Sequence, residues 1–283
     1  MVPAITNGLF VVLMLNNKKS NYYIYILMNL ENKGKIIASI INKIDPKKNK
    51  DIYNENDKNN IKNYLEEIIL DSDEYIQQIP DKKIERSVLY ITGASGSGKS
   101  YYTREYIKQY RITFPKNGIY LFSSLNEDAT LDKLTYIKRV NLDDGFLSTP
   151  FTIEDFKNSL IIYDDIDVIS YKPMKRKLYE IMDMILQTGR HSRTSFIFTS
   201  HQANKGNDTK MILNECHSIT IFPNNMGKRT SQYLLEGMFG FDRDDIKKIR
   251  KIGTKSRWVS ILKTFPIIVA YNNGAYVVNT EDK

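Results

Sequence analysis

The sequence predicts an α/β fold: a mostly parallel central sheet with helices on both faces. Two observations support this prediction. From residue 86 onward, strand-like and helix-like segments alternate, which is typical of parallel α/β domains. The strand-like segments are nearly continuous runs of Ile, Leu, Val and Phe, as expected for a sheet buried on both faces. We expect these strands at residues 88–92, 119–123, 136–142, 160–164, 196–200 and 218–222.

The segments between and after these strands carry helical patterns, at 99–110, 174–188, 208–216, 229–239 and 244–252. The end of the chain differs, because β-like runs at 258–262 and 267–271 are followed by Asn272-Asn273-Gly274 and another run at 275–278. Asn-Gly between two β runs is the strongest short signal for a hairpin. We therefore expect a C-terminal β-hairpin.

Residues 1–85 differ in composition and predict an N-terminal extension, rich in strands and ending in a helix, ahead of a main domain at 86–283. Strand patterns lie at 10–15, 22–28 and 34–44, with a polar hairpin loop at 16–20 between the first two. Residues 45–60 are polar and charged, which indicates a linker or loop. Residues 61–79 carry apolar residues at a helical spacing. We expect this extension to be a docking or subunit-contact module.

The composition excludes several classes of protein. The chain has 283 residues with 41% hydrophobic and 26% charged residues, which suits an ordinary globular protein. Its single cysteine, Cys216, excludes a disulfide framework and a four-cysteine zinc ribbon. No apolar run reaches the ~18 residues of a membrane helix, and no signal-peptide pattern is present, so we expect no membrane partner. The net charge of +8 favours a polyanionic partner.

The clearest motif is the octapeptide Gly-Ala-Ser-Gly-Ser-Gly-Lys-Ser, which fits G-x-x-x-x-G-K-[ST] at every required position. It follows a buried strand pattern and opens a helix, as a phosphate-binding loop must. The glycines let the backbone N–H groups wrap around phosphates, Lys99 would reach the β and γ phosphates, and Ser100 would ligate Mg²⁺. The predicted nucleotide-binding residues are Gly93, Ala94, Ser95, Gly96, Ser97, Gly98, Lys99, Ser100 and Tyr101.

A second motif is the apolar run 160–163 followed by two aspartates. In open α/β sheets ligands bind at the carboxyl ends of the strands, so these carboxylates would face the nucleotide. We expect Asp164 to hold Mg²⁺ and Asp165 to act as the general base, with Asp167 as the alternative base. An aspartate at 165 keeps the chemistry of a glutamate but shortens its reach.

Two further side chains complete the expected catalytic set. Gln202 follows the strand pattern at 196–200, and a glutamine there can hydrogen-bond both the γ-phosphate and the attacking water. An arginine just after the helix at 174–188 could reach the nucleotide of a neighbouring subunit as an arginine finger. Arg190 is the first candidate for this role and Arg193 the second.

These motifs together resemble the FtsK–HerA class of P-loop ATPases, and within it the genome-packaging ATPases of poxviruses, other large DNA viruses and virophages. The resemblance covers about residues 88–278 and leaves out 1–85. It depends on segments in a fixed order: 93–100, 160–165, Gly189-Arg190-His191, the strand ending at Gln202, 218–223, Ser256-Arg257-Trp258-Val259 and Phe265-Pro266.

The resemblance implies an ATP-driven, Mg²⁺-dependent translocase that packages double-stranded DNA into a preformed capsid. It implies a homo-oligomeric ring of five or six subunits, with a capsid or portal protein as partner. The implied location is the host cytoplasm or viral factory, or the virion. It also implies an extra strand between the P-loop strand and the acidic strand, and the segments at 119–123 and 136–142 are the candidates for it.

DNA contacts should be basic side chains that grip phosphates without reading bases. The expected surface is Lys172, Lys175, Arg176 and Lys177, just after the acidic pair, and a second basic segment spans 247–257. Three alternatives remain: a nucleotide-type kinase, a cellular DNA pump, and an ATP-binding assembly factor that is not coupled to DNA. A regulatory GTPase is excluded, because Asn42-Lys43-Ile44-Asp45 precedes the loop instead of following it.

Overall fold

The computed structural model describes residues 27–55, 64–204 and 206–278, which form two sheets and the helices around them. The larger sheet has ten strands in the order β5-β15-β14-β13-β12-β7-β11-β10-β8-β9, and the smaller has five in the order β4-β1-β3-β2-β6. The strand predicted at 10–15, the loop at 16–20 and most of the strand at 22–28 lie outside the described residues.

One half of the large sheet is parallel, as predicted. It contains β7 (Val88–Thr92), β8 (Gly118–Ser123), β9 (Lys138–Arg139), β10 (Ser159–Asp164), β11 (Ser195–Ser200) and β12 (Ser218–Ile221). Each pairs in parallel with its neighbours within this group. The strand predicted at 136–142 is shorter than expected, because only Lys138 and Arg139 pair with β8. All six strands therefore end at one common edge of the sheet.

The predicted extra strand between the P-loop strand and the acidic strand is confirmed, but its expected source is wrong. The strand between β7 and β10 is β11, which follows both of them in the chain. The segments at 119–123 and 136–142 instead lie on the far side of β10, as β8 and β9. Chain order alone does not set lateral order, because each crossover helix can carry the chain past a strand already in place.

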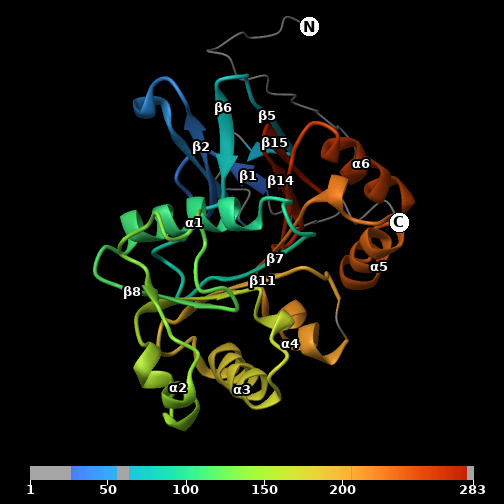
Figure 1. Ribbon diagram of the computed structural model, residues 1–283. Helices are drawn as coiled ribbons and strands as arrows, with labels where there is room; N and C mark the ends of the chain where they lie inside the picture. The colour runs from blue at the N-terminus through green and yellow to red at the C-terminus, as the bar shows by residue number, and fades with distance from the viewer. Residues whose placement is uncertain (1–26, 56–63, 205, 279–283) are drawn as a thin grey trace, which may run out of the picture.

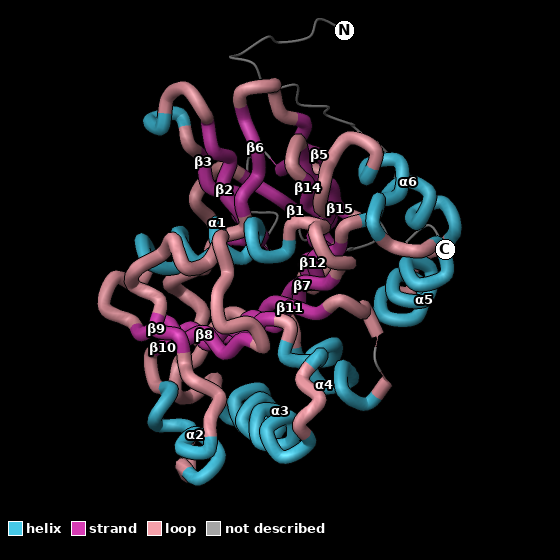
Figure 2. Tube along the Cα trace, viewed as in Figure 1, coloured by secondary structure: helices cyan, strands magenta, loops and turns pink. Residues whose placement is uncertain are grey.

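Helices cover both faces of the parallel half, as Figures 1 and 2 show. α1 (Lys99–Thr113) packs on one face through Tyr102, Tyr106, Ile107 and Tyr110. The other face is covered by α3 (Lys172–Thr188) and α4 (Asn207–Glu215), with the short α2 (Asp144–Ser148) beside α3. On this face α5 (Lys228–Phe239) and α6 (Arg243–Gly253) cover the other half of the sheet.

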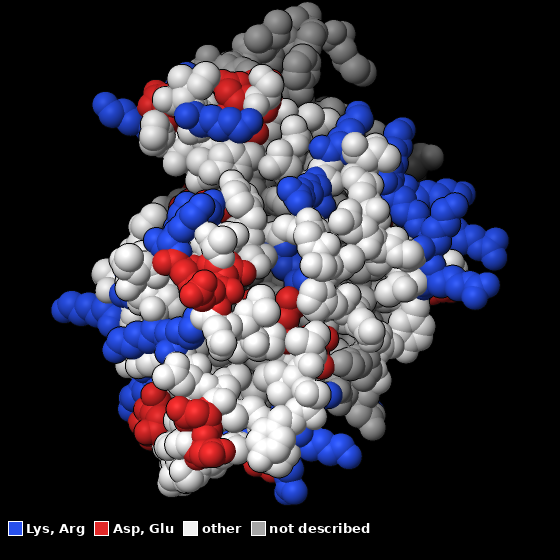
Figure 3. Space-filling view, viewed as in Figure 1, with Lys and Arg blue, Asp and Glu red and all other residues white. Residues whose placement is uncertain are grey.

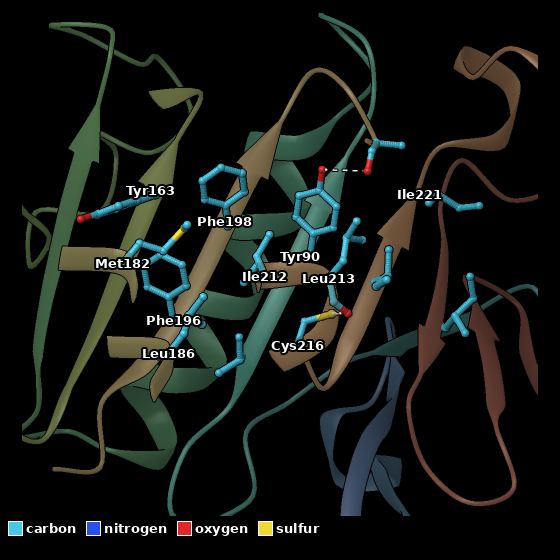
Figure 4. Close-up of a cluster of buried hydrophobic side chains, with 14 of the residues drawn as sticks. Tyr90, Tyr163, Met182, Leu186, Phe196, Phe198, Ile212, Leu213, Cys216 and Ile221 are labelled. Atoms are coloured by element: carbon cyan, nitrogen blue, oxygen red, sulfur yellow. Dashed lines mark hydrogen bonds between the residues drawn. The ribbon is translucent and has the colours of Figure 1, made fainter. Parts of the chain in front are cut away.

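The core under α3 and α4 is dense and aromatic (Figure 4). Tyr90, Phe196 and Phe198 project from β7 and β11 toward Met182 and Leu186 of α3, and all five side chains are buried. Burying an aromatic side chain of this size stabilises a fold by about 1.5–3 kcal/mol. The Tyr90 hydroxyl donates to the carbonyl oxygens of residues 202 and 203, at 2.8 and 3.2 Å. This core therefore also anchors the loop that follows β11.

The C-terminal half of the sheet is antiparallel and contains the predicted hairpin. β13 (Val259–Leu262), β14 (Ile268–Tyr271) and β15 (Gly274–Val277) follow one another in antiparallel pairs. Gly274 already pairs with Tyr271, so the loop consists of Asn272 and Asn273 alone. The hairpin prediction is confirmed.

The N-terminal region is built from strands, and two predictions made for it are wrong. The expected linker at 45–60 contains a 3-10 turn (Pro46–Lys48) and β3 (Lys50–Glu55). In place of the helix expected at 61–79 the chain forms β4 (Tyr64–Leu65), β5 (Glu67–Ile69) and β6 (Glu74–Gln77). The remaining strands are β1 (Leu27–Asn29) and β2 (Lys35–Asn42). Pairing with neighbouring strands overrides a weak helical pattern here.

The two sheets share one apolar core. Buried residues of the small sheet, among them Met28, Ile40 and Ile76, pack with Ile268 and Ala270 of β14. β5 adds directly to β15, so a strand of the N-terminal region closes the edge of the large sheet. The boundary expected at residue 85 stays a prediction, although these contacts join the regions on either side of it. In the described part of the chain, no helix is long and apolar enough to span a membrane.

The shared core makes a prediction about cooperativity. Ile268→Ala should lower the free energy of unfolding by about 2–5 kcal/mol, because a fully buried side chain is truncated. Far-UV circular dichroism and the fluorescence of Trp258, which packs against this core, should report a single coincident transition. The matched control is Ile44→Ala, since Ile44 is 78% exposed and its loss should change stability by less than about 0.5 kcal/mol. Two separated transitions would contradict a single cooperative unit.

Candidate functional site

The predicted phosphate-binding loop has the backbone that such a loop requires. It joins β7 to α1, with Gly98 as the residue before the first helical turn. Gly96 and Gly98 have φ angles of 72° and 115°, a region that favours glycine. The first-turn N–H groups of α1 have no partner within the helix and point toward the loop. The loop is therefore an anion site made from main-chain donors and a helix N-terminus.

Lys99 lies inside this site. Its side chain is only 6% exposed, and Nζ donates to the Gly93 carbonyl oxygen at 3.1 Å. Nζ also lies 3.5 Å from Oδ1 of Asp165, which forms a mostly buried ion pair. Asp165 is thus brought beside Lys99, as expected if the acidic pair faces the predicted nucleotide loop.

Asp164 ends β10 and is almost fully buried, with 2% exposure. Oδ1 accepts a hydrogen bond from the Thr199 hydroxyl at 2.9 Å, and Oδ2 accepts one from the Ser123 hydroxyl at 3.4 Å. Burial, and then the negative charge of Asp165, raise the pKa of Asp164 to about 6. A buried carboxylate of this kind is poised to gain from a nearby cation.

Asp165 has a strained backbone and several partners. Its φ is 50°, which is uncommon for a residue other than glycine, and its amide donates to Thr199 Oγ1 at 3.1 Å. The carboxylate contacts Lys99 through one oxygen and His201 Nε2 through the other, the latter at 2.9 Å. The alternative base, Asp167, is buried and accepts from Ser200 Oγ at 3.0 Å. Of the two, Asp165 is the carboxylate beside the lysine.

The structure places His201, and not Gln202, against these groups. His201 Nδ1 is 3.4 Å from Lys99 Nζ, while the Gln202 side chain is exposed. The main chain of Gln202 is held in place, since its carbonyl accepts from Tyr90 and Ser200 and its amide donates to Ser200 Oγ. His201 was missed because successive side chains at a strand end point in opposite directions, and the sequence does not show which one faces the site.

Predicted magnesium and nucleotide ligands lie around the same loop. Ser100 is half-buried in the first turn of α1, and Tyr101 is 59% exposed with the Arg104 guanidinium 4.6 Å from its ring centroid. Two buried hydroxyls of the site, Thr92 Oγ1 and Ser97 Oγ, have no hydrogen-bond partner among the described residues. The buried carboxylate of Asp164 and these unpaired hydroxyls fit a bound Mg²⁺–nucleotide, which Ser100 and Asp164 would hold through oxygen.

A second residue that the sequence did not single out for the site is Arg257. It precedes β13, and its guanidinium donates to the carbonyl oxygens of Ser97 and Gly96 at 2.7 and 2.9 Å. These carbonyls belong to the phosphate-binding loop, so a residue 160 positions away braces the back of the loop. The resemblance includes the tail motif that contains Arg257, but it does not imply a role for this residue.

The candidate arginine fingers lie at the opposite edge of the sheet. Arg190 follows the C-terminus of α3 and pairs with Glu85, which precedes β7. Arg193 follows directly and precedes β11. Because the intervening strand has six residues, this edge is roughly 20 Å from the nucleotide loop. Neither arginine can contact a nucleotide bound to its own chain.

Two basic surfaces lie on different helices. The predicted one opens α3, where Lys172 and Arg176 are exposed and Lys175 and Lys177 are half-buried. Together with Tyr179 and Asp183, Lys172, Lys175 and Arg176 line an open cavity of about 430 Å³. The other surface covers α5 and α6, where Lys and Arg side chains crowd together (Figure 3). It includes Lys228, Arg229, Arg243, Lys247, Lys248, Arg250, Lys251 and Lys255.

Comparison with known proteins assigns the chain to a family of viral proteins. No family model matches it. A Sputnik virophage protein, called uncharacterized protein V3, is 42% identical over 193 residues, which is 67% of this chain and 76% of that protein. The chain belongs to the family of V3. The predicted similarity to virophage proteins is therefore confirmed.

Solved structures with a similar arrangement are more distant. The DNA-packaging ATPase B204 from Sulfolobus turreted icosahedral virus is 14% identical, with a TM-score of 0.45 over 66% of this chain and 97% of that one. The cytoplasmic domain of the secretion ATPase EccC from Thermomonospora curvata is 14% identical, with a TM-score of 0.48 over 77% of this chain and 30% of that one. The strand order of this chain and the loop before α1 are themselves those of a P-loop NTPase fold.

The raised pKa of Asp164 predicts that this carboxyl group lowers the free energy of unfolding at neutral and higher pH. Its contribution to stability is fully present below the unfolded pKa of 3.8 and is lost as pH rises through about 6, where the buried carboxyl ionises. At pH 8 without metal, Asp164→Asn should therefore be more stable than the wild type by about 1–3 kcal/mol. Urea unfolding in chelator should show this difference shrink toward pH 4.

The matched control is Asp71→Asn, since Asp71 is exposed and no buried charge is removed. This variant should follow the wild type at every pH. A stability difference for Asp164→Asn that does not depend on pH would contradict the assigned ionisation.

Proposed function

We propose that this protein hydrolyses ATP with Mg²⁺. The observation that carries the proposal is the contact between Lys99 of the nucleotide loop and Asp165, with Asp164 beside it at the same sheet edge. Lys99 and the loop N–H groups would neutralise the phosphates, and Ser100 and Asp164 would hold the Mg²⁺. The buried position of Lys99 strengthens its attraction for phosphate, because the surrounding dielectric is low.

In this proposal Asp165 orients the attacking water. The water oxygen forms a bond to the γ-phosphorus as the bond to the bridging oxygen of ADP breaks. The proton released by the water passes to the Asp165 carboxylate, and ADP leaves with the electron pair. Mg²⁺ supplies charge neutralisation on the phosphate oxygens. An aspartate reaches less far than a glutamate, but the left-handed backbone at Asp165 turns its carboxylate toward Lys99.

We further propose that hydrolysis drives double-stranded DNA into a viral capsid. The ordered motifs across residues 88–278 support this, as does membership in a virophage protein family. The proposal includes a homo-oligomeric ring, a capsid or portal partner, and a location in the host cytoplasm, the viral factory or the virion. Residues 1–85 would contribute to docking or subunit contacts.

The DNA-contact surface that we propose is the start of α3. Lys172, Lys175, Arg176 and Lys177 lie in its first turns, where no acidic residue is present and where the helix dipole disfavours positive charge. Arg176 has an i,i+4 ion pair with Glu180, and Lys175 lies over the ring of Tyr179, so these two have partners on the helix itself. The unfavourable position near the helix N-terminus is what supports a role for this basic group outside the helix. On α6, by contrast, Arg250 and Lys251 lie in the last turn, where the dipole stabilises them.

The first prediction of this proposal concerns turnover. Purified protein with Mg²⁺ should release phosphate from ATP, faster with long double-stranded DNA of any sequence, and less so as salt is raised. Lys99→Ala should lower kcat by about 100-fold or more, since it removes a charge aimed at the transition state. Transfer of the phosphate to another acceptor would indicate the kinase alternative. ATP binding without turnover would indicate the assembly factor.

Charge reversal locates the DNA contact in the same assay. Lys175→Glu with Arg176→Glu should abolish stimulation by DNA and leave the basal rate within about threefold. Lys247→Glu with Lys251→Glu on α6 is the matched control, with the same change in net charge. Equal loss in both pairs would show that stimulation follows net charge and not the α3 surface.

A further prediction concerns Arg190, which we propose to act on the nucleotide of a neighbouring subunit. Arg190 lies at the sheet edge opposite the nucleotide loop of its own chain, so it could act only on a nucleotide held by another subunit. Arg190→Ala should keep ATP binding and lose hydrolysis, and it should poison wild-type subunits in mixed rings. Activity that falls only in proportion to the mutant fraction would rule out the trans role. Arg193→Ala is the companion variant that tests the second candidate.

A further inference from the structure

His201 occupies a position that neither the resemblance nor the proposed chemistry assigns. It is the first residue after β11, between the strands that carry the nucleotide loop and the acidic pair. Its ring touches both charged partners of the site, with Nε2 2.9 Å from Asp165 Oδ2 and Nδ1 3.4 Å from Lys99 Nζ. The imidazole side chain is 31% exposed, so the ring is partly open to solvent.

The two contacts define which ring nitrogen carries the proton. An ammonium group has three donors and no acceptor, so Nδ1 facing Lys99 must offer its lone pair. Nε2 then carries the hydrogen and donates it to the Asp165 carboxylate. A neutral ring in this tautomer satisfies both neighbours at once.

Asp165 depends on this bond when nucleotide binds. In the present arrangement its carboxylate has Lys99 on one oxygen and His201 on the other, with the Thr199 hydroxyl 3.3 Å from Oδ1. A bound γ-phosphate draws the Lys99 ammonium toward itself, because phosphate carries more charge than one carboxylate. His201 is then the donor that still fixes Oδ2, which leaves Oδ1 to accept a hydrogen bond from water.

We infer that His201 is the positioning residue that holds Asp165 in register with the attacking water. The role expected of Gln202 was a different one, a hydrogen bond to the γ-phosphate and to the water itself. The inference rests on the proposed ATP hydrolysis and adds the residue that aligns its base. Gln202 is poorly placed for this task, because Tyr90 and Ser200 hold its main chain while its side chain is exposed.

The kinetic test compares three variants with the wild type. His201→Phe keeps a planar ring but lacks the donor, and should lower kcat by about 100-fold with KM and ATP-analogue affinity within about threefold. His201→Gln restores an N–H near the position of Nε2 and should recover activity to within about tenfold of the wild type. Gln202→Ala is the matched control and should keep kcat within about threefold. The opposite ranking of His201→Phe and Gln202→Ala would overturn the inference.

A second measurement does not depend on turnover. Nitrogen-15 NMR of the histidine side chains, with the His201 signal assigned by its loss in His201→Phe, should show the Nε2–H tautomer at pH 7.5. Addition of Mg²⁺ and a non-hydrolysable ATP analogue should leave that tautomer in place. An Nδ1–H tautomer, or loss of the Nε2 hydrogen bond with the analogue, would overturn the role of His201 even in an active enzyme. If the wild type binds ATP without hydrolysing it, the proposed function fails while this spectrum still decides whether His201 holds Asp165.

Discussion

The site depends on the parallel pairing of three strands, β7, β11 and β10. Thr92 pairs with Ser200, and Phe198 pairs with Tyr163, so the three strands end within about one residue of one another. A polar residue follows each strand and lies at this shared edge of the sheet: Lys99 after β7, Asp165 after β10 and His201 after β11. Backbone hydrogen bonds of the sheet thus bring together side chains that are 36 to 102 positions apart in the chain. A register shift of one residue would turn them away from each other.

This arrangement concentrates charge where the fold would be more stable without it. Lys99, Asp164 and Asp165 are largely buried, and a buried charge lowers stability unless partners compensate for it. The compensation is incomplete in the described site, because burial still raises the pKa of Asp164 and two buried hydroxyls lack partners. A site with too little positive charge and with hydroxyl donors left unpaired is matched to a ligand that brings both a cation and oxygen acceptors.

The antiparallel half of the sheet stabilises this edge from the side. Arg257, which enters β13, binds two carbonyls of the nucleotide loop, and Tyr102 of α1 hydrogen-bonds Ser260 within β13 at 2.8 Å. The same strands share a core with the N-terminal sheet, and Gln78 reaches across to Ser218 of β12 at 2.9 Å. The position of the loop is therefore set by regions far from it in sequence. Arg86 acts similarly at the other edge, where it donates to two carbonyls at the end of α3.

The sequence by itself determined the nucleotide loop, the acidic pair and the alternation of strands and helices. These are local features: eight adjacent residues define the loop, and an apolar run with two aspartates defines the acidic strand. The C-terminal hairpin was also predictable, because its turn chemistry lies in two residues. Only the tertiary structure decided that β11 lies between β7 and β10, that residues 61–79 form strands, and that His201 and Arg257 reach the site. The physical reason is that lateral strand order and side-chain direction depend on contacts between distant segments, and a local pattern carries no information about them.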